Sequence, residues 1–311
     1  MLTDLESIPQ KCLEVMKIRP LRYLGGRVNR HWLVESSESS DRKLVLQAYC
    51  GEQITGAAYE HEVLRRLHRL AWPVPEIVAP PTPLYESGEL WVLFTFLPGS
   101  PKVENKPEDR RARGRLLARL HQSTRTLVDL GQRPSFCMAD QVVNDPALAD
   151  AIRDFETVRP AEAHMMRWHL EKAIEGFTNV DRNKADVLVL HGDFAPWNIL
   201  YNDSKLSGLI DFEATHLNYR VSDFALAWRG HQDEVIQGYE EEHPLSSFDR
   251  QMIIPCYWSW LFLGVKDEIG RIKNGAPIHG FDWQIRHFLM RSKFLNIMPY
   301  PGPKPIVITG E

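Results

Sequence analysis

The most constraining part of the chain is the segment 187–213, where two short apolar runs each lead into acidic and amide side chains. The first run is followed by H-G-D-F-A-P-W-N, which places Asp193 and Asn198 five residues apart. The second run ends in L-I-D-F-E and places Asp211 at its end. Phosphoryl transfer from ATP needs one carboxylate for the hydroxyl, and an amide and a second carboxylate to hold magnesium on the phosphates. Asp and Asn are common in turns, so it is the order of these residues after two strand-like runs that indicates this chemistry.

Protein kinases carry H-R-D-x-x-x-x-N followed by D-F-G in the same order. Here H-G-D-x-x-x-x-N is followed by I-D-F-E, and this variant resembles the aminoglycoside phosphotransferase and choline kinase superfamily, which also includes homoserine, methylthioribose and fructosamine kinases. We expect Asp193 to be the catalytic residue, and Asn198 and Asp211 to be the Mg²⁺ ligands. The resemblance implies that His191 fixes the catalytic loop.

The resemblance extends to the segment S-D-F-A-L-A, which contains Asp223. It is similar to the family's G-D-P-x-x-D-L-A, in which an Asp at a helix start braces the catalytic loop through backbone amides. The residues 218–220 (N-Y-R) stand where G-D-P is expected, so the local geometry there is open. Glu213 either supplements the metal site, orients the loop or touches a cationic substrate, or it is a solvated loop residue.

A glycine pair, Gly25 and Gly26, lies between strand-like runs near the N-terminus. Glycines let backbone amides approach phosphates, although an ordinary hairpin turn explains the pair as well. In the phosphate-binding interpretation Asn29 resembles the Asn or Ser of the family's loop. Arg27 and Arg30 are then candidate phosphate contacts.

Kinase-like sites usually pair a lysine on the third strand with a helix glutamate. Glu60 stands at the expected helix position, but Gln47 stands where Lys or Arg is expected. Lys43 is four residues away, about 13 Å along a strand, and is a poor substitute. Either Arg27 or Arg30 supplies the missing charge, or nucleotide binding is weak.

The segment F-T-F-L-P-G resembles the family's hinge, whose backbone hydrogen-bonds adenine, so Thr95, Phe96 and Leu97 are candidate nucleotide contacts. The chain is strand-rich before this segment and helical after it. We therefore predict an α+β, bilobal protein-kinase-like fold. Its small β-rich N-terminal lobe for nucleotide binding would comprise residues 1–97, and its larger, mainly helical catalytic and substrate-binding lobe residues 98–311.

Hydrophobic periodicity and Pro/Gly punctuation locate the elements in more detail. Strand-like runs occupy residues 21–34 and 43–49, and a β-hairpin is predicted over 84–97. Helices are predicted at 55–70, 145–158, 160–177, 222–242 and, as a buried helix, 253–265.

Composition limits the partners. Of 311 residues, 25% are charged and 43% hydrophobic, as in ordinary soluble proteins. The net charge of -4 argues against nucleic-acid binding, and the longest apolar run is too short for the ~20 residues of a membrane helix. The four scattered cysteines and the acidic N-terminus favour a cytoplasmic protein with reduced thiols and no secretory signal. The oligomeric state stays open.

Together these patterns predict an ATP- and Mg²⁺-dependent kinase that phosphorylates a hydroxyl of a small, amine-bearing metabolite or antibiotic. The acceptor pocket would come from the C-terminal region, which is rich in tryptophans and acids, although core and surface roles explain these residues as well: Trp228, Trp258, Trp260, Asp233, Glu234, Glu240, Glu241 and Glu242. The alternative is a catalytically inactive pseudokinase, which Gln47 favours. A metal-dependent hydrolase would need more closely spaced ligands than this segment offers.

Overall fold

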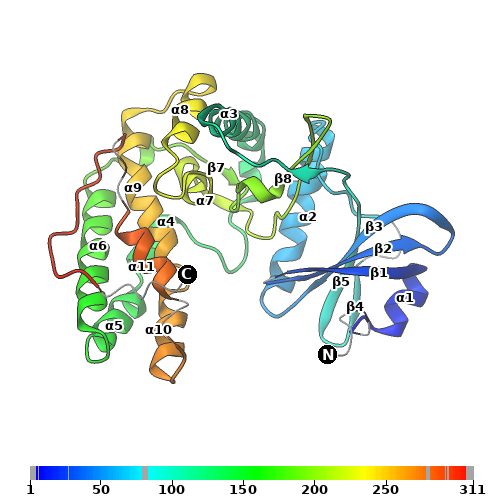
Figure 1. Cartoon of the computed structure of the whole chain (residues 1–311), viewed down its shortest axis with the longest axis horizontal. Coiled ribbons are helices and arrows are strands. Elements are labelled where there is room, and N and C mark those ends of the chain that lie inside the picture. Colours follow the sequence, from blue (N-terminus) through cyan, green and yellow to red (C-terminus); the bar gives the residue numbers. More distant parts are fainter. Residues whose placement is uncertain are drawn as a thin grey trace. The chain divides into compact units, whose positions relative to one another are not determined.

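The fold is α+β, as predicted, with an antiparallel sheet in the N-terminal part and helices in the C-terminal part (Figure 1). The structure is a computed structural model that describes residues 5, 7–26, 28–78, 83–277, 281–290, 292 and 294–305. The chain divides into two compact units. We call the first the sheet unit, comprising residues 1–103, 130–136 and 195–215, and the second the helical unit, comprising 104–129, 137–194 and 216–311. The lobe boundary between residues 97 and 98 stays a prediction.

The sheet unit contains an antiparallel sheet with the strand order β1-β2-β3-β5-β4. Its elements are α1 (Gln10–Met16), β1 (Ile18–Gly25), β2 (Arg30–Ser36), β3 (Ser39–Tyr49), α2 (Gln53–Arg69), β4 (Leu84–Glu86) and β5 (Glu89–Thr95). Trp32 and Trp91 stack at 5.3 Å between ring centroids in the core on one face. Helix α2 contacts β3 and buries Val63, Leu64 and Leu67, whereas Leu70 at its C-terminal end is exposed.

A smaller sheet in the same unit carries the segment after Asn198. It consists of β6 (Ser100–Pro101), β8 (Ile199–Asn202) and β9 (Lys205–Leu209), in the order β6-β8-β9. Asp203 and Ser204 connect β8 to β9, and both have positive φ, which suits a tight hairpin turn. The N–H of Leu209 donates to the carbonyl of Pro73 at 2.8 Å, which ties this sheet to the segment after α2.

The helical unit contains a short antiparallel strand pair, β7 (Val187–Leu190) with β10 (His216–Tyr219). Its helices are α3 (Pro107–Thr124), α4 (Ala139–Val143), α5 (Pro146–Phe155), α6 (Pro160–Thr178), α7 (Phe224–Trp228), α8 (Asp233–Glu242), α9 (Ser247–Phe262), α10 (Val265–Lys273) and α11 (Asp282–Phe288). Short 3-10 turns along the chain are η1 (Arg125–Leu130), η2 (Arg182–Lys184), η3 (Pro196–Asn198) and η4 (Arg220–Asp223).

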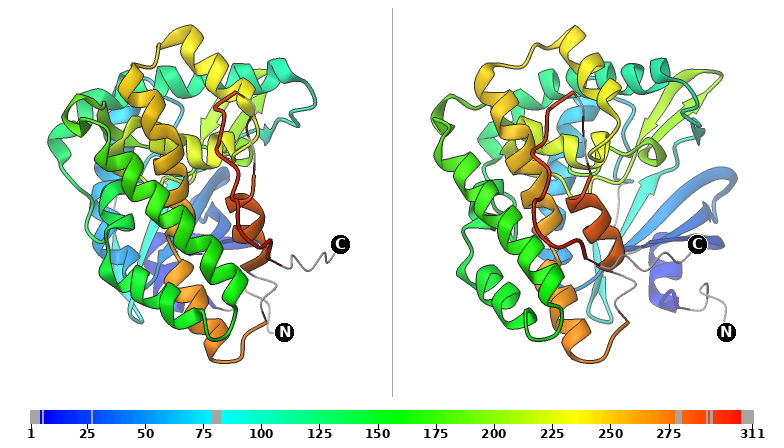
Figure 2. Two further views of the ribbon diagram at one scale, coloured as in Figure 1. Left: turned by 90° about the vertical axis from the view of Figure 1, so that its left-hand side faces the viewer. Right: turned by 60° about the vertical axis from the view of Figure 1, so that its left-hand side comes forward.

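Two helix pairs hold the helical unit together, α3 with α8 and α6 with α9. Figure 2 shows α6 in green beside α9 in gold. The close approach depends on Gly176, because a Cβ there would lie 2.5 Å from Cγ of Pro255. No helix in the described part of the chain has the length and hydropathy of a membrane span.

Most predicted helices are present, but the helix expected over 222–242 is interrupted. Arg229 and Gly230 both have positive φ, so α7 ends there and α8 starts three residues later. Left-handed residues break the hydrogen-bond ladder of a right-handed helix. The run 21–34 is likewise divided into β1 and β2 at the glycine pair.

Candidate active site

The loop that carries Asp193 is clamped by a buried carboxylate. Asp223, at the end of η4, accepts hydrogen bonds from the backbone N–H of His191 at 2.9 Å and of Gly192 at 2.8 Å. Its Oδ2 also lies 3.0 Å from Nε2 of His121 on α3. Three donors on one carboxylate fix the two residues immediately before Asp193. The sequence resemblance implied such a brace for Asp223, but it did not reveal His121.

Asp223 is held in its charged form by these donors. Burial would raise the pKa of Asp223, but the hydrogen bond and charge of His121, together with His191, outweigh burial and lower the pKa below its ordinary value. The other ring nitrogen of His121 lies 2.9 Å from the hydroxyl of Tyr239 on α8.

His191 is buried, with 1% of its surface exposed. Its Nδ1 accepts a hydrogen bond from the backbone N–H of Asp193 at 3.2 Å, and its ring packs edge-on against Phe194. These contacts suit a residue that shapes the loop rather than one that exchanges protons with a substrate. The role of His191 stays a prediction on this basis.

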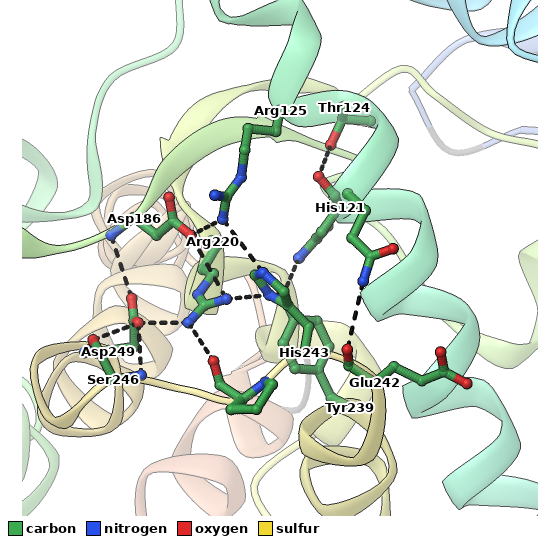
Figure 3. A network of polar contacts seen from close by, with 12 residues as sticks. His121, Thr124, Arg125, Asp186, Arg220, Tyr239, Glu242, His243, Ser246 and Asp249 are labelled. Carbon is green, nitrogen blue, oxygen red and sulfur yellow. Dashed lines mark hydrogen bonds and ion pairs between the residues drawn. The ribbon is translucent and has the colours of Figure 1, made fainter.

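The start of η4 is anchored by a second polar cluster (Figure 3). Arg220 donates to Oδ2 of Asp249 at 2.6 Å, and Ser246 donates to the same oxygen at 2.6 Å. Arg220 also donates to Nδ1 of His243. Burial, assisted by the charge of Arg220, lowers the pKa of His243 and so keeps that nitrogen available as an acceptor. Arg220 is the last of the three residues that stand where the family's G-D-P is expected, and its contacts anchor the start of η4. Asp223 anchors the end of η4, so this turn is held at both ends.

In the sheet unit, the register of β8 and β9 brings the two predicted metal ligands to one end of a hairpin. Ile199 pairs with Leu209, and the N–H of Ile210 donates to the carbonyl of Asn198 at 3.0 Å. Asn198 and Asp211 therefore flank the same end of the two strands. Asp211 has φ of 68°, in the left-handed region that Asp tolerates better than most residues.

The turn between β1 and β2 is shaped by its glycines. Gly25 and Gly26 have φ of 98° and 137°, and a Cβ on Gly26 would lie 1.8 Å from the carbonyl oxygen of Asn29. Asn29 itself is fully buried, and its side-chain amide donates to the carboxylate of Glu213 at 2.7 Å. The turn is thereby linked to the loop that follows Asp211.

The two arginines proposed as phosphate contacts have different outcomes. Arg27 lies outside the described residues. Arg30 pairs with Glu89 on β5 and lies 5.3 Å from the ring centroid of Trp32. Its charge is already engaged on the sheet, so Arg30 is a poor substitute for the missing lysine.

Gln47 is buried on β3, and its side chain hydrogen-bonds His31 on β2. Glu60 on α2 accepts a hydrogen bond from the hydroxyl of Tyr49 at 3.0 Å, and its other oxygen lies 3.8 Å from Nη2 of Arg133. Sequence reasoning missed Arg133, because it lies between predicted elements in a segment that carries no motif. Its contact with Glu60 arises from the tertiary fold.

Burial raises the pKa of Glu60 to about 8. Arg133 and Tyr49 oppose this rise, whereas the charges of Glu213 and Asp211 add to it. The buried carboxyl therefore lies in a field where one nearby cation competes with burial and two other carboxylates.

The predicted hinge follows β5. The N–H of Thr95 donates to the carbonyl of Glu76 at 2.8 Å, and the Thr95 hydroxyl accepts from the Glu76 N–H at 3.0 Å. An adenine would have to use the carbonyl of Thr95 or the backbone of Phe96 and Leu97. These three assignments stay predictions.

The tryptophans and acids considered for an acceptor pocket are engaged elsewhere. Trp228 and Trp258 are buried, and Asp233 accepts from the Trp228 indole at 2.8 Å and from Ser292 at 2.7 Å. The glutamates of α8 pair with arginines: Glu234 with Arg110, Glu240 with Arg250, Glu241 with Arg111 and Arg115, and Glu242 with Arg119. These contacts fit core and surface roles. Trp260 is half-buried against Tyr257 and Trp283, and the acceptor pocket stays a prediction.

Known proteins resemble the chain over most of its length. Residues 18–245 match the model of the Phosphotransferase enzyme family (APH). A homoserine kinase of Xanthobacter autotrophicus is 28% identical over 186 residues, 53% of this chain and 52% of that protein. An aminoglycoside 3'-phosphotransferase of Streptomyces fradiae is 26% identical over 179 residues, 55% of this chain and 63% of that protein. The chain thus spans between half and two thirds of the curated relatives it matches.

A solved structure extends the likeness in the fold. An amicoumacin kinase in complex with AMP-PNP, Ca²⁺ and Ami has a TM-score of 0.63 at 13% identity, covering 93% of this chain and 95% of that one. At this identity the likeness shows the fold alone. The family match is the stronger finding, because it spans well over half of the sequence and includes Asp193, Asn198 and Asp211. The chain belongs to the phosphotransferase enzyme family.

Proposed function

We propose that this protein is an ATP- and Mg²⁺-dependent phosphotransferase that phosphorylates a hydroxyl group of a small, amine-bearing metabolite or antibiotic. The observation that carries the proposal is the placement of Asn198 and Asp211 at one end of the β8–β9 hairpin. Family membership supports the reaction type. We further propose that residues 1–97 act as the nucleotide-binding lobe and 98–311 as the catalytic and substrate-binding lobe.

The donor set fits magnesium. An amide oxygen and a carboxylate are hard oxygen ligands, and Mg²⁺ is commonly held by one or two carboxylates together with substrate phosphates and water. Bound there, Mg²⁺ would neutralise charge on the phosphates. A backbone hydrogen bond joins Ile210 to Asn198, and Asp211 has a left-handed backbone conformation. Both features would position the two side chains before Mg²⁺ or nucleotide binds.

Asp193 would orient the acceptor hydroxyl and take its proton during transfer. Its loop is prepared for that task, because Asp223 fixes the two preceding residues and His191 accepts the hydrogen bond of the Asp193 N–H. Preorganisation of this kind lowers the cost of reaching the reactive geometry.

The nucleotide would be held by the sheet unit. The turn at Gly25 and Gly26 would cover the phosphates with backbone amides, and the hinge after β5 would bind adenine through the backbone of Thr95, Phe96 and Leu97. The names of the two curated relatives favour an amine-bearing acceptor, because homoserine and aminoglycosides both carry amino groups. An ATP-dependent enzyme of this kind would act in the cytoplasm.

A pseudokinase is the second candidate, and Gln47 is the observation that favours it. A neutral amide hydrogen-bonded to His31 brings no charge to a phosphate. The presence of Asp193, Asn198 and Asp211 favours the enzyme.

One experiment separates the two. Mg²⁺–ATP binding is measured by calorimetry, and ATP consumption is then screened with homoserine, choline, methylthioribose, amino sugars and aminoglycosides. Asp193→Asn serves as the matched control, since it should lower turnover by about 10²-fold or more while leaving nucleotide affinity nearly unchanged. Nucleotide binding without turnover on any acceptor would favour the pseudokinase, and the absence of both would contradict the enzyme proposal.

A further inference from the structure

A buried guanidinium lies inside the sheet unit, in a segment that sequence motifs do not mark. Arg133 has 1% of its surface exposed. It lies in the segment 130–136, which belongs to the sheet unit although the residues on either side of it belong to the helical unit. Burying a cation is costly unless hydrogen bonds and opposite charge compensate. The contacts of Arg133 therefore indicate which parts of the sheet unit it connects.

Arg133 contacts helix α2 on one side. Its Nη2 donates to the side-chain oxygen of Gln53 at 3.2 Å and lies 3.8 Å from Oε2 of Glu60. Both Glu60 and Arg133 are buried, and Oε2 of Glu60 makes no hydrogen bond within the described part of the chain. The guanidinium is the cation that faces this carboxyl oxygen.

On the other side, Arg133 contacts the loop that follows Asp211. Its Nη1 lies within hydrogen-bonding distance of the carbonyls of Phe212, at 3.5 Å, and Thr215, at 3.3 Å. The N–H of Thr215 in turn donates to the Phe212 carbonyl at 2.9 Å, which closes a tight turn there. One side chain therefore joins α2 to the turn immediately after the predicted metal ligand.

Helix α2 is shaped to admit this arginine. A Cβ on Gly56 would lie 2.4 Å from Nε, 2.7 Å from Nη2 and 2.9 Å from Cζ of Arg133. Glycine within a helix costs about 1 kcal/mol relative to alanine, so its presence at the contact indicates that space for the guanidinium is needed.

Other residues are poorly placed for this role. Gln47, at the expected lysine position, is neutral and hydrogen-bonded to His31. Arg30 is paired with Glu89. A planar guanidinium with several donors can reach a carboxyl group and two carbonyls together, which a lysine ammonium does less well.

We propose that Arg133 is the cationic partner of Glu60 in this chain and the positioning residue that connects α2 to the loop carrying Asp211. A third-strand lysine would pair with the helix glutamate and contact phosphate. Arg133 takes over the pairing with Glu60 but does not contact phosphate, because it is buried. The link to catalysis rests on the proposed phosphotransferase function. The contact network itself does not.

The first test is made on the ligand-free protein. Arg133→Gln should raise the hydrogen-exchange rate of the Thr215 amide by about tenfold or more, since this amide lies in the turn that Arg133 holds. It should also lower Tm by about 6 °C or more, because it removes a buried guanidinium that contacts Gln53 and the carbonyls of Phe212 and Thr215. Arg66→Gln is the matched control, since Arg66 pairs with Glu62 in a half-buried position on the same helix. Arg133→Lys should fall between wild type and Arg133→Gln in both measurements.

The second test uses nucleotide. Arg133→Gln and Glu60→Gln should each weaken Mg²⁺-dependent AMP-PNP binding by about fivefold or more, and the double variant should be no worse than Arg133→Gln alone. The matched cycle with Arg66→Gln and Glu62→Gln should stay within about twofold of wild type at every corner.

Gly56→Ala decides the case if Arg133→Gln does not fold. It keeps both charges and favours the helix, yet its methyl group displaces the guanidinium, so Thr215 exchange should rise and Mg²⁺-dependent binding should weaken in a folded protein. Unchanged Thr215 exchange in folded Arg133→Gln or Gly56→Ala overturns the proposal. A wild type that binds no nucleotide contradicts the proposed function instead, and the exchange measurement still decides the role of Arg133.

Discussion

The side-chain amide of Asn29 donates a 2.7 Å hydrogen bond to the carboxylate of Glu213, which lies 184 positions further along the sequence. Asn29 is fully buried in the turn between β1 and β2, and Glu213 is two residues beyond Asp211. The bond joins the turn expected to cover phosphates to the loop expected to hold magnesium. A substitution in one of these loops should therefore alter the energetic effect of a substitution in the other.

A double-mutant cycle tests this coupling. Asn29→Ala and Glu213→Ala should each destabilise the protein, and their interaction energy should be about 1 to 2 kcal/mol, because the bond has a charged acceptor. Urea unfolding of the wild type, both single variants and the double variant measures it. Additivity within about 0.5 kcal/mol would show that the contact contributes nothing.

Asp211→Asn should abolish the Mg²⁺ dependence of nucleotide binding. Asn tolerates the left-handed backbone of Asp211, so the substitution removes the charge without straining the loop. Calorimetric titration of AMP-PNP with and without Mg²⁺ checks the result. Asp203→Asn, at another left-handed aspartate in the β8–β9 turn, is the control and should retain the dependence. A normal Mg²⁺ effect in Asp211→Asn would remove Asp211 from the metal site.

Asp223→Asn should destabilise the protein by about 3 kcal/mol or more at neutral pH, because one amide cannot replace a buried carboxylate that accepts three hydrogen bonds. Since the pKa of Asp223 is lowered in the folded state, its stabilisation is present above the unfolded-state value near pH 4 and is lost as pH falls through the lower folded value. The difference in unfolding free energy between wild type and Asp223→Asn should therefore shrink below about pH 4.

Urea unfolding at several pH values measures that difference. Asp181→Asn, at an exposed aspartate, is the control for general effects of acid. A difference that stays constant from pH 7 down to about pH 3 would contradict the lowered pKa.

Glu60 should contribute a pH dependence of the opposite sign. Its pKa is raised to about 8 by burial, so its contribution to stability is greatest below the unfolded-state value near 4.5 and is lost as pH rises through about 8. Glu60→Gln, which stays neutral, should therefore gain stability relative to wild type by a few kcal/mol between about pH 5 and pH 9. Unfolding curves at both ends of this range measure the gain. Glu52→Gln, at an exposed glutamate beside the start of the same helix, is the control for general effects of pH.

Local patterns determined much of this protein in advance. The α+β class, the 84–97 hairpin, and the helices near 55–70, 145–158, 160–177 and 253–265 follow from apolar periodicity and proline placement, which act over a few neighbouring residues. The order H-G-D-x-x-x-x-N and I-D-F-E identified the family for the same reason: the chemistry needs these side chains at fixed short spacings.

Tertiary structure decided the rest. The break at Arg229 and Gly230 was not predicted from an otherwise helical pattern. Glycine adopts a left-handed conformation readily, but Arg229 does so only where its surroundings impose it. Likewise, the contact of Arg133 with Glu60 joins positions 73 residues apart. His121 with Asp223, and Asn29 with Glu213, are more distant still. Which charged side chains pair depends on which of them lie close together after folding. The sequence therefore showed that the expected lysine is absent, and only the tertiary structure showed that Arg133 lies opposite Glu60.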